Sequence, residues 1–279
     1  MTAAAQTAVL TETAYAKINL ALHVRARRAD GYHELETFFA FVDAGDVLEA
    51  RPADADVLEL HGEFAALLAG ETSNLVTDAL ALLPHGGAGW HVRLDKRLPV
   101  AAGLGGGSAD VGAVFRMVAR AHGLPDGWPA LAARLGADVP ACVDSLPVIG
   151  RGTGTELAPA ATDLAGCPVL LVNPRLPVPT GPVFKAWDRV DRGPMPEGSA
   201  RAVMLEGRND LEAPAITICP AVADVLAALR HGGEAWAARM SGSGATCFAL
   251  YDSDAARDAA AARIAASRPG WWQMAGRLR

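Results

Sequence analysis

A glycine-rich segment ahead of an amphipathic stretch is the strongest chemical signal in the chain. It reads Gly103-Leu104-Gly105-Gly106-Gly107-Ser108, and apolar side chains follow at helical spacing. Because glycine has no Cβ atom, this backbone can approach a ligand closely and turn its N–H groups toward it. The following helix would add unpaired amides and the positive end of its dipole, so a phosphate group is the expected ligand. Ser108 could cap that helix or place its hydroxyl on a phosphate or on Mg²⁺.

The segment fits neither of the two most common phosphate-binding fingerprints. A P-loop requires a lysine after its last glycine, and none follows Gly107. The dinucleotide fingerprint requires glycine or alanine at its sixth position, directly after a buried strand. Here the sixth position is Ser108, and Lys96, Arg97 and Pro99 intervene after the predicted strand. A flexible connector ending in a capped helix is the simpler alternative, although three consecutive glycines would then cost entropy without binding anything.

Asp138 and Lys17 are the candidates for acid–base chemistry on a bound triphosphate. Phosphoryl transfer to a hydroxyl needs a group that takes the proton and a cation near the transferred phosphoryl. Asp138 follows a predicted helix stop and precedes Val139-Pro140, which predicts a short, extended and rigid segment. A lysine beside this carboxylate would keep it ionised at neutral pH. Each residue also has a simpler interpretation, as a solvated turn aspartate and as an exposed strand lysine.

The first predicted strand, Tyr15 to Arg25, must position Lys17. Its residues alternate, so that an aliphatic face lies opposite a polar face that carries Lys17, Asn19 and His23. A second glycine loop, Ser241-Gly242-Ser243-Gly244, separates two later predicted strands. Its simplest interpretation is a tight hairpin connection. Its functional interpretation is a second set of backbone amides opposite the first.

The remaining elements mix strands and helices without regular alternation. Strands are expected near 90–94, 169–172, 235–240, 246–251 and 271–274, and helices near 74–83, 128–135, 183–190, 221–231 and 255–266. Ser73 is the expected cap of the first helix, and Ala44-Gly45-Asp46 predicts a turn between two apolar segments. This order favours an α+β fold over a doubly wound parallel sheet. A Pro- and Gly-rich stretch at 144–166 predicts two domains, residues 1–160 and residues 161–279.

The composition limits the classes of function. The net charge is −6, with 25 basic and 31 acidic residues, which disfavours a nucleic-acid partner. The four cysteines are widely spaced and form no metal-binding or disulfide pattern. The N-terminus lacks the features of a signal peptide, and no apolar run is long enough to span a bilayer. We therefore expect a cytoplasmic enzyme with a small-molecule partner and without nucleic-acid or membrane partners; a homo-oligomer stays open.

Three segments together resemble the motifs of one kinase superfamily. They are Tyr15 to Leu20 (YAKINL), Pro99 to Asp110 (PVAAGLGGGSAD) and Ser241 to Phe248 (SGSGATCF). In this order they are similar to the galactokinase, homoserine kinase, mevalonate kinase and phosphomevalonate kinase (GHMP) superfamily, with matching blocks from near residue 15 to near residue 250. Shorter blocks, Arg28 to Leu35 and Gly136 to Pro140 among them, resemble members that use ATP to phosphorylate a 2-hydroxyl on a cytidine diphosphate-bearing intermediate of non-mevalonate isoprenoid biosynthesis. The resemblance implies a two-domain α+β kinase with its active site in the cleft between the domains.

The resemblance also implies a role for each matching residue. Asp138 would be the base and Lys17 its partner. Tyr32 and Phe184 would hold both faces of a cytosine ring whose polar edge His33 contacts. The adenine of ATP would lie near Asn74, Leu75 and Lys96. Asn19 and Thr180 would contact the methylerythritol and diphosphate parts, and Gly242, Ser243 and Gly244 would complete the substrate site. The ATP phosphates would be bound by Pro99, Val100, Ala101, Ala102, Gly103, Leu104, Gly105, Gly106, Gly107, Ser108 and Ala109.

Two positions depart from the superfamily pattern, and one ligand set stays unassigned. Ala109 stands where a second serine is common, and Gly112 lies inside the predicted helix, where it should cost about 1 kcal/mol relative to alanine. No carboxylate is assigned to Mg²⁺, which would be carried mainly by the phosphates and water, with Ser108 as a candidate ligand. Two alternatives stay open: a superfamily kinase for homoserine, mevalonate or a sugar, and a non-catalytic RNA-binding module. The aromatic residues Tyr32 and Phe184 disfavour the first, and the acidic net charge disfavours the second.

Overall fold

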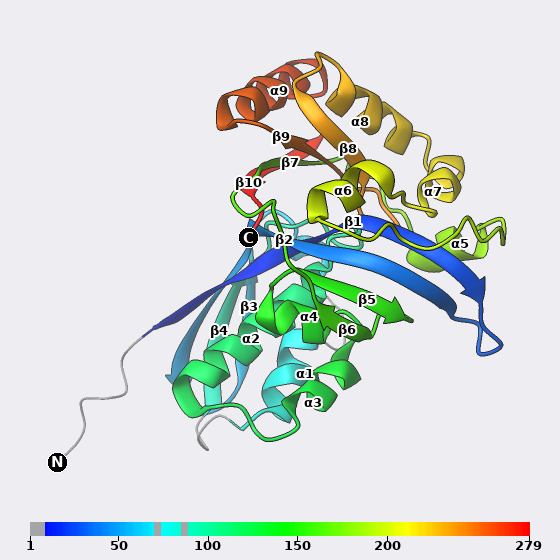
Figure 1. Cartoon of the computed structure of the whole chain (residues 1–279). Coiled ribbons are helices and arrows are strands. Elements are labelled where there is room, and N and C mark those ends of the chain that lie inside the picture. The colour runs from blue at the N-terminus through cyan, green and yellow to red at the C-terminus, as the bar shows by residue number, and fades with distance from the viewer. Residues whose placement is uncertain (1–8, 70–73, 85–88) are drawn as a thin grey trace. The chain divides into compact units, whose positions relative to one another are not determined.

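The computed structural model describes residues 9–69, 74–84 and 89–279 (Figure 1). They divide into two compact units, each built from separate stretches of chain. The first unit comprises the described parts of Met1–Ala16, Gly45–Val100 and Gly106–Ser145. The second comprises Lys17–Ala44, Ala101–Gly105 and Leu146–Arg279. The long strands β1 (Leu10–Arg27) and β2 (His33–Ala53) run through both units.

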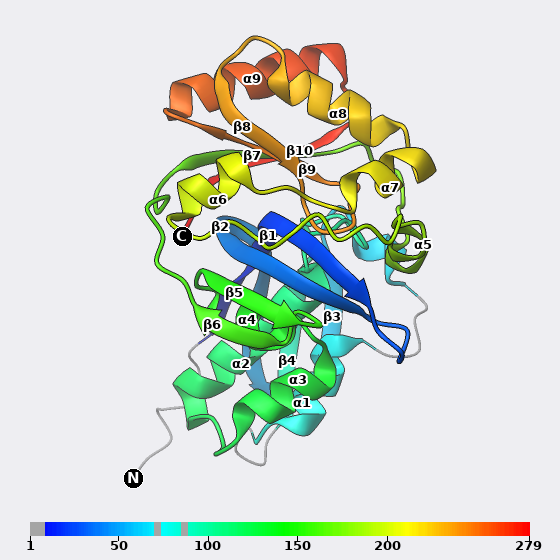
Figure 2. The ribbon, with the colours of Figure 1, turned by 45° about the vertical axis from the view of Figure 1, so that its right-hand side comes forward.

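The first unit packs four helices against short strands. Strand β4 (Gly89–Asp95) pairs antiparallel with the C-terminal part of β2 and parallel with β3 (Val57–His61), which is followed by the 3-10 helix η1 (Ala65–Leu67). Four helices lie together on one side of these strands (Figure 2): α1 (Leu75–Leu82), α2 (Gly106–His122), α3 (Trp128–Leu135) and α4 (Val139–Asp144). The predicted helix after the glycine-rich segment is α2, but it begins inside the segment, at Gly106.

Gly112 explains how closely α2 and α4 pack. A Cβ atom at Gly112 would lie only 2.3 Å from the carbonyl oxygen of Cys142 on α4. The glycine that lowers the intrinsic stability of α2 is therefore the residue that lets the second helix approach.

The second unit contains a four-stranded antiparallel sheet in the order β10-β7-β9-β8. Its strands are β7 (Pro168–Asn173), β8 (Ala235–Met240), β9 (Cys247–Tyr251) and β10 (Trp272–Arg277). Helices α8 (Ala221–Arg230) and α9 (Asp254–Ser267) cover one face of this sheet (Figures 1 and 2). Their apolar faces, with Val225 and Ile264, join Leu170 and Val172 of β7 in one buried cluster. This burial is the main stabilising contribution to the unit.

The rest of the second unit surrounds the N-terminal part of β2. Strand β5 (Val148–Gly152) pairs with residues 35–39 of β2, and β6 (Glu156–Pro159) pairs with β5. Three short helices complete the unit: α5 (Thr180–Lys185), α6 (Ala200–Glu206) and α7 (Glu212–Ile218). In the described part of the chain, no helix is long and apolar enough to cross a membrane.

Several sequence predictions are confirmed and others are wrong. The helix at 128–135 ends where predicted, and α1 matches the expected helix with Asn74 as its cap; the predicted cap Ser73 lies outside the described residues. The predicted turn at Ala44-Gly45-Asp46 is wrong, because β2 continues through it. A Cβ atom at Gly45 would lie 1.8 Å from the carbonyl oxygen of Ala14, so the glycine permits a close strand approach instead of a turn.

Two further local predictions need correction. Val139-Pro140 is not extended but forms the first turn of α4, where proline is tolerated because that N–H has no helical partner. The helix expected at 183–190 is α5 and ends at Lys185. Its chain continues irregularly to Arg189, whose φ of +64° is incompatible with a right-handed helix. The stretch 144–166, expected to be weakly patterned, contains β5 and β6.

Candidate active site

Lys17 and Asn19 lie on the buried part of β1, in the second unit. Lys17 is only 4% exposed, and its Nζ donates to Asn19 Oδ1 at 3.4 Å and lies 4.3 Å from the ring centroid of Phe39. Asn19 Nδ2 in turn donates to Thr37 Oγ1 at 2.8 Å. The predicted polar face of β1 is therefore covered rather than exposed. Because each partner is itself held, the ammonium group has a fixed position.

The turn formed by residues 103–105 lies against Lys17. The backbone N–H of Lys17 donates to the carbonyl oxygen of Leu104 at 3.0 Å. Gly105 has a φ of +62°, and a Cβ atom there would lie 3.0 Å from Lys17 Cε. Glycine therefore supplies a left-handed conformation and leaves room for the lysine side chain. Two predicted functional segments, far apart in sequence, are in contact here.

The second glycine loop contacts the same turn. Ser241 Oγ donates to the carbonyl oxygen of Gly103 at 2.7 Å and accepts from the backbone N–H of Asn19 at 3.3 Å. The hydroxyls of Thr180 and Ser243 are 3.0 Å apart. The loop is thus more than a hairpin connection, because it joins β1, the first glycine turn and the start of α5.

Asn209 stabilises the second glycine loop, Ser241 to Gly244, through its side-chain amide. Its Nδ2 donates to the carbonyl oxygens of Met240 and Gly242, at 2.9 and 2.8 Å. Asn209 is 8% exposed, so these bonds lie largely out of solvent. Asn209 begins the block Asn209-Asp210-Leu211-Glu212, which resembles the kinase superfamily. The sequence alone assigned no role to this block. An isolated asparagine carries no signal that it will position a loop more than 30 residues away.

The first unit gathers the other part of the predicted ATP site. Gly106, Gly107 and Ser108 are the first residues of α2. A Cβ atom at Gly106 would lie 3.5 Å from Lys96 Nζ, and one at Gly107 would lie 3.2 Å from Leu75 Cδ1. Asn74 precedes Leu75 and caps α1, with its Oδ1 accepting from the N–H of Val76 at 2.9 Å. The residues expected around adenine and phosphate therefore cluster at the start of α2.

Lys96 is held by two carboxylates under the first turn of α2. Its Nζ donates to Asp46 Oδ2 at 2.5 Å and to Asp110 Oδ2 at 2.8 Å, and all three side chains are at most 5% exposed. Asp46 Oδ1 also accepts from the N–H groups of Arg97 and Leu98, at 2.6 and 2.8 Å. Asp46 thereby fixes the segment that leads into the glycine-rich loop. Neither carboxylate was identified from the sequence, since Asp46 looked like a turn residue.

The two carboxylates share one cation, and the pKa values of Asp110 and Lys96 are both shifted. Burial raises the pKa of Asp110 well above its usual range; Lys96 opposes this shift and the neighbouring Asp46 adds to it. Burial alone would lower the pKa of Lys96, but Asp110 and Asp46 raise it above its ordinary value. Asp110 Oδ1 is buried and has no hydrogen-bond partner among the described residues. The two carboxylates therefore favour the charged form of Lys96, and burial favours the protonated form of Asp110.

Asp138 lies at the N-terminus of α4 in the first unit. Its φ and ψ of −85° and −13° are helical, and its side chain makes no capping hydrogen bond. Ser108 lies on the same side of this unit, with its Oγ 3.8 Å from where a Cβ atom at Gly136 would stand. Asp138 and Lys17 belong to different units, so the predicted Lys–Asp pair stays a prediction.

His33 lies in an aromatic cluster where β2 begins. Its ring centroid is 5.0 Å from that of Phe184 and 5.8 Å from that of Trp187, the latter edge to face. Burial and then the charge of Arg27 lower the pKa of His33, so the ring is neutral at physiological pH and offers one donor and one acceptor. Tyr32 precedes it and is 67% exposed. Trp187 was not identified from the sequence, because it fell inside a predicted helix.

His23, expected to share the polar face of Lys17, has a different role. It is fully buried; its Nε2 accepts from the N–H of Arg208 at 3.1 Å, and its Nδ1 lies 3.3 Å from the carbonyl oxygen of Gly193. Both ring nitrogens are engaged with backbone groups, so His23 supports the fold of the second unit.

Comparisons with known proteins identify the family to which this fold belongs. The model of the GHMP kinase N-terminal domain matches residues 74–145, and that of the GHMP kinase C-terminal domain matches residues 197–269. A crystal structure titled 4-(cytidine 5'-diphospho)-2C-methyl-D-erythritol kinase has a TM-score of 0.81 and 34% identity, covering 96% of this chain and 99% of that one. A homoserine kinase from Cytophaga hutchinsonii, at 17% identity and a TM-score of 0.68, covers 97% and 95% and shares the fold. The predicted α+β fold class is confirmed as that of the GHMP kinases.

Relatives of high identity narrow the assignment. A protein of Novosphingobium aromaticivorans named 4-diphosphocytidyl-2-C-methyl-D-erythritol kinase is 66% identical over 97% of this chain and 93% of its own length. One of the same name from Erythrobacter litoralis is 62% identical, covering 97% and 100%. The chain therefore belongs to the 4-diphosphocytidyl-2-C-methyl-D-erythritol kinase family of the GHMP kinases, and the narrower resemblance of its motifs is confirmed.

Proposed function

We propose that this chain transfers the terminal phosphoryl group of ATP to the 2-hydroxyl of 4-diphosphocytidyl-2-C-methyl-D-erythritol, giving the 2-phosphate and ADP. The reaction belongs to non-mevalonate isoprenoid precursor biosynthesis. The observation that carries the proposal is the 66% identity to a relative of that name over 97% of the chain. Membership of a kinase family and the two glycine loops support it further.

Asp138 would be the base of this reaction. Its carboxylate would take the proton of the 2-hydroxyl as the hydroxyl oxygen attacks the γ-phosphorus and ADP departs. Lys17 would keep that carboxylate ionised and stabilise charge on the transferred group. The contacts of Lys17 with Asn19 and Phe39 support this role, because they hold the ammonium before substrate arrives.

The glycine-rich loop would bind the phosphates of ATP. Residues Pro99 to Ala109 supply backbone amides, and the first turn of α2 adds its free N–H groups and the positive end of its dipole. Lys96, held by Asp46 and Asp110, lies beneath Gly106 and supports this turn. Asn74, Leu75 and Lys96 would line the adenine site.

Mg²⁺ would reach the site with the nucleotide. Within the described residues, no group of three or more His, Cys, Asp and Glu side chains could hold a metal ion. One serine hydroxyl, that of Ser108, beside backbone amides suits an ion that keeps most of its ligands from phosphate oxygens and water. Bound Mg²⁺ would neutralise phosphate charge during transfer.

The acceptor would be recognised by its cytidine. Phe184 and Tyr32 would stack on the base, and the neutral ring of His33 would contact its polar edge. Asn19, Thr180 and residues 242–244 would hold the methylerythritol diphosphate part. The contact between Thr180 and Ser243 supports this grouping, since it places two hydroxyl donors side by side.

A coupled ADP-release assay with a panel of acceptors tests the proposal. We expect turnover with 4-diphosphocytidyl-2-C-methyl-D-erythritol and none above background with homoserine, mevalonate or galactose. Product analysis by phosphorus NMR should place the new phosphate on the 2-hydroxyl. Turnover with another of these acceptors and none with the cytidyl compound would contradict the proposed substrate.

The enzyme would work in the cytoplasm. Its four cysteines are free thiols, as expected in a reducing compartment.

A further inference from the structure

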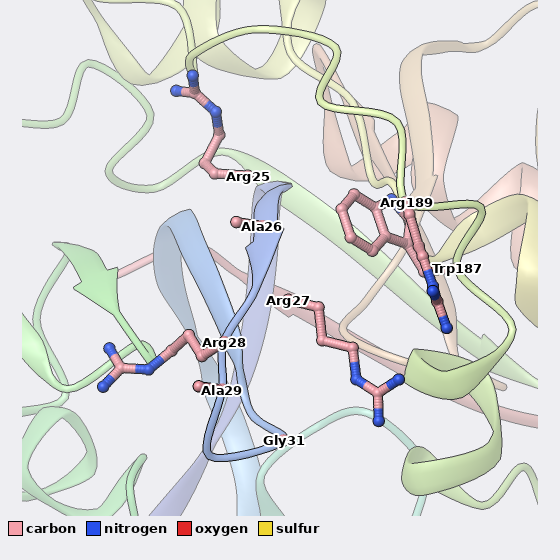
Figure 3. A pocket seen from close by; sticks show the side chains of 8 residues that line it. All are labelled: Arg25, Ala26, Arg27, Arg28, Ala29, Gly31, Trp187 and Arg189. Carbon is pink, nitrogen blue, oxygen red and sulfur yellow. The ribbon is translucent and has the colours of Figure 1, made fainter.

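A basic pocket opens in the second unit beside the loop that joins β1 to β2 (Figure 3). Its volume is about 710 Å³, which is within the range of small-molecule sites. Four arginines and a tryptophan line it: Arg25, Arg27, Arg28, Arg189 and Trp187. None of these residues has a role in the proposed phosphoryl transfer.

Two of the four arginines are already neutralised. Arg25 binds Asp191 at 2.8 Å and Glu36 at 3.3 Å. Arg28 binds Asp30 at 3.1 Å and Glu34 at 3.2 Å. These pairs stiffen both ends of the loop but leave little charge for a ligand.

The side chains of the other two arginines, Arg27 and Arg189, have no ion pair or hydrogen-bond partner among the described residues. Figure 3 shows both on the same side of the loop, together with Trp187, whereas Arg28 points to the opposite side. Two guanidinium groups that share a pocket and lack a carboxylate present up to ten N–H donors in planar forks. Such forks match the oxygen geometry of phosphate groups.

Arg189 also has an unusual backbone. Its φ is +64°, in the left-handed region that favours glycine. A non-glycine residue in this conformation is uncommon and points to a local requirement for its side chain. The conformation occurs four residues after α5 ends at Lys185, in the irregular segment that brings Arg189 to the pocket wall.

Trp187 adds an unsatisfied donor to the same wall. The residue is 5% exposed, and its Nε1–H is buried without a partner in the described part of the chain. Its ring meets that of His33 edge to face, at 5.8 Å between centroids. The pocket therefore shares a wall residue with the predicted cytosine clamp.

From these observations we infer that the pocket of Arg27, Arg189 and Trp187 is an anion site for the phosphate or diphosphate group of a small molecule. The two guanidinium groups bind the phosphoryl oxygens. Occupancy affects acceptor binding through the contact between Trp187 and His33; this last step rests on the proposed function.

The surrounding charge selects a compact anion over a polyanion. Asp30, Glu34, Glu36, Asp188 and Asp191 lie in the flanking ion pairs. Because these carboxylates are paired, only the guanidinium groups of Arg27 and Arg189, of the described residues that line the pocket, are left to attract an anion. Two such groups suit one phosphate or diphosphate, and together with the net charge of −6 they offer no extended basic surface to a nucleic acid.

Isothermal titration with inorganic pyrophosphate tests the site. A saturating nonhydrolysable ATP analogue is added first, so that the glycine-rich loop is occupied. We expect saturable binding to the full chain and at least tenfold weaker binding to Arg27→Ala and Arg189→Gly. The glycine variant suits the positive φ, so its melting temperature should not fall.

The control is Arg268→Ala, which removes an exposed arginine that also lies beside a tryptophan, 5.3 Å from the centroid of the Trp271 ring. This variant should bind pyrophosphate as the unaltered chain does. Absence of saturable binding, or equal binding by all variants, would overturn the inference.

Kinetics then identify the source of the phosphate group. If pyrophosphate raises the KM of the acceptor and leaves kcat unchanged, the pocket takes the diphosphate of the acceptor itself. If pyrophosphate still binds at saturating acceptor, but with a changed Kd, the ligand is a separate phosphorylated molecule whose site is coupled to the acceptor site. An unchanged Kd would contradict the coupling through Trp187 and His33. Binding of pyrophosphate through these arginines, without phosphorylation of any acceptor, would contradict the proposed function but would still support the anion site.

Discussion

Ser241 and Gly103, 138 positions apart, share a hydrogen bond of 2.7 Å from the serine hydroxyl to the glycine carbonyl oxygen. The contact goes beyond this bond, because a Cβ atom at Gly103 would lie 2.3 Å from the carbonyl oxygen of Ser241. Two loops that the sequence showed only as separate glycine clusters are therefore packed backbone to backbone. No side chain fits between them.

Gly103→Ala should disrupt this packing. The alanine would combine the strain of a φ of +76° with a backbone clash, so we expect a loss of about 3 kcal/mol or more in unfolding free energy, together with a raised KM for ATP. Gly123→Ala is the matched control: its φ is +78°, but nothing lies within 4 Å of the added Cβ atom. The control should lose about 1–2 kcal/mol by urea unfolding and keep its ATP KM. Equal losses in both variants would show that strain alone matters.

Asp138→Asn should abolish most of the turnover without affecting nucleotide affinity. An amide cannot accept the hydroxyl proton, and we expect kcat to fall by about 10²- to 10⁴-fold while the Kd for ATP is unchanged. Asp144→Asn, at the other end of α4, should retain full activity. The proposed base is wrong if Asp138→Asn keeps more than a third of the original kcat.

Tyr32→Ala should raise the acceptor KM far more than the ATP KM. The side chain is 67% exposed, so its loss should change stability by less than about 0.5 kcal/mol. Steady-state kinetics with each substrate varied in turn provide the test. Equal increases in the two KM values would argue against a cytosine clamp.

Asp46→Asn should be much more destabilising than Asp110→Asn. Asp46 accepts from Lys96 and from two backbone N–H groups, so removing its charge should cost about 2–4 kcal/mol. Burial already raises the pKa of Asp110, and among the described residues Asp110 accepts only from Lys96, so the same change there should cost less than it does at Asp46. Urea unfolding of both variants measures the difference, and a larger loss for Asp110→Asn would show that the two roles are reversed.

The pH dependence of stability should report His23. Burial, and then the charge of Arg208, lower its pKa in the folded chain. The folded state thus favours the neutral ring, whose contribution is fully present above the unfolded pKa of about 6.5 and is lost as the pH falls toward the folded value. Unfolding free energy should therefore decline between pH 6.5 and 5 more steeply in the original chain than in His23→Asn. Parallel curves for the two proteins would assign the decline to other groups.

The sequence was most informative where local chemistry alone determines structure. The glycine-rich start of α2, the helix at 128–135 and the alternation of β1 could be predicted because spacing and breakers act over a few residues. The three superfamily motifs allowed the fold class to be predicted as well. Within each unit some residues of these motifs are in contact, Lys17 with the 103–105 turn and Leu75 with Gly107.

What the sequence did not reveal depends on contacts between distant segments. Gly45 has the local chemistry of a turn residue. It lies inside the continuous strand β2 because β1 packs too closely there for a side chain. Asp46 and Asp110 become important only because folding brings both onto Lys96. Trp187 and Arg189 fell inside the helix predicted at 183–190, but α5 ends at Lys185 and both residues lie in the irregular segment after it.

The interleaving of the two units limits how this chain can be divided. The chain passes between them five times, after residues 16, 44, 100, 105 and 145, so no single cut yields either unit intact. One of these passages falls between Gly105 and Gly106, inside the glycine-rich loop itself. Truncated fragments, or chimaeras that exchange one half of the chain, should therefore fail to fold into either unit.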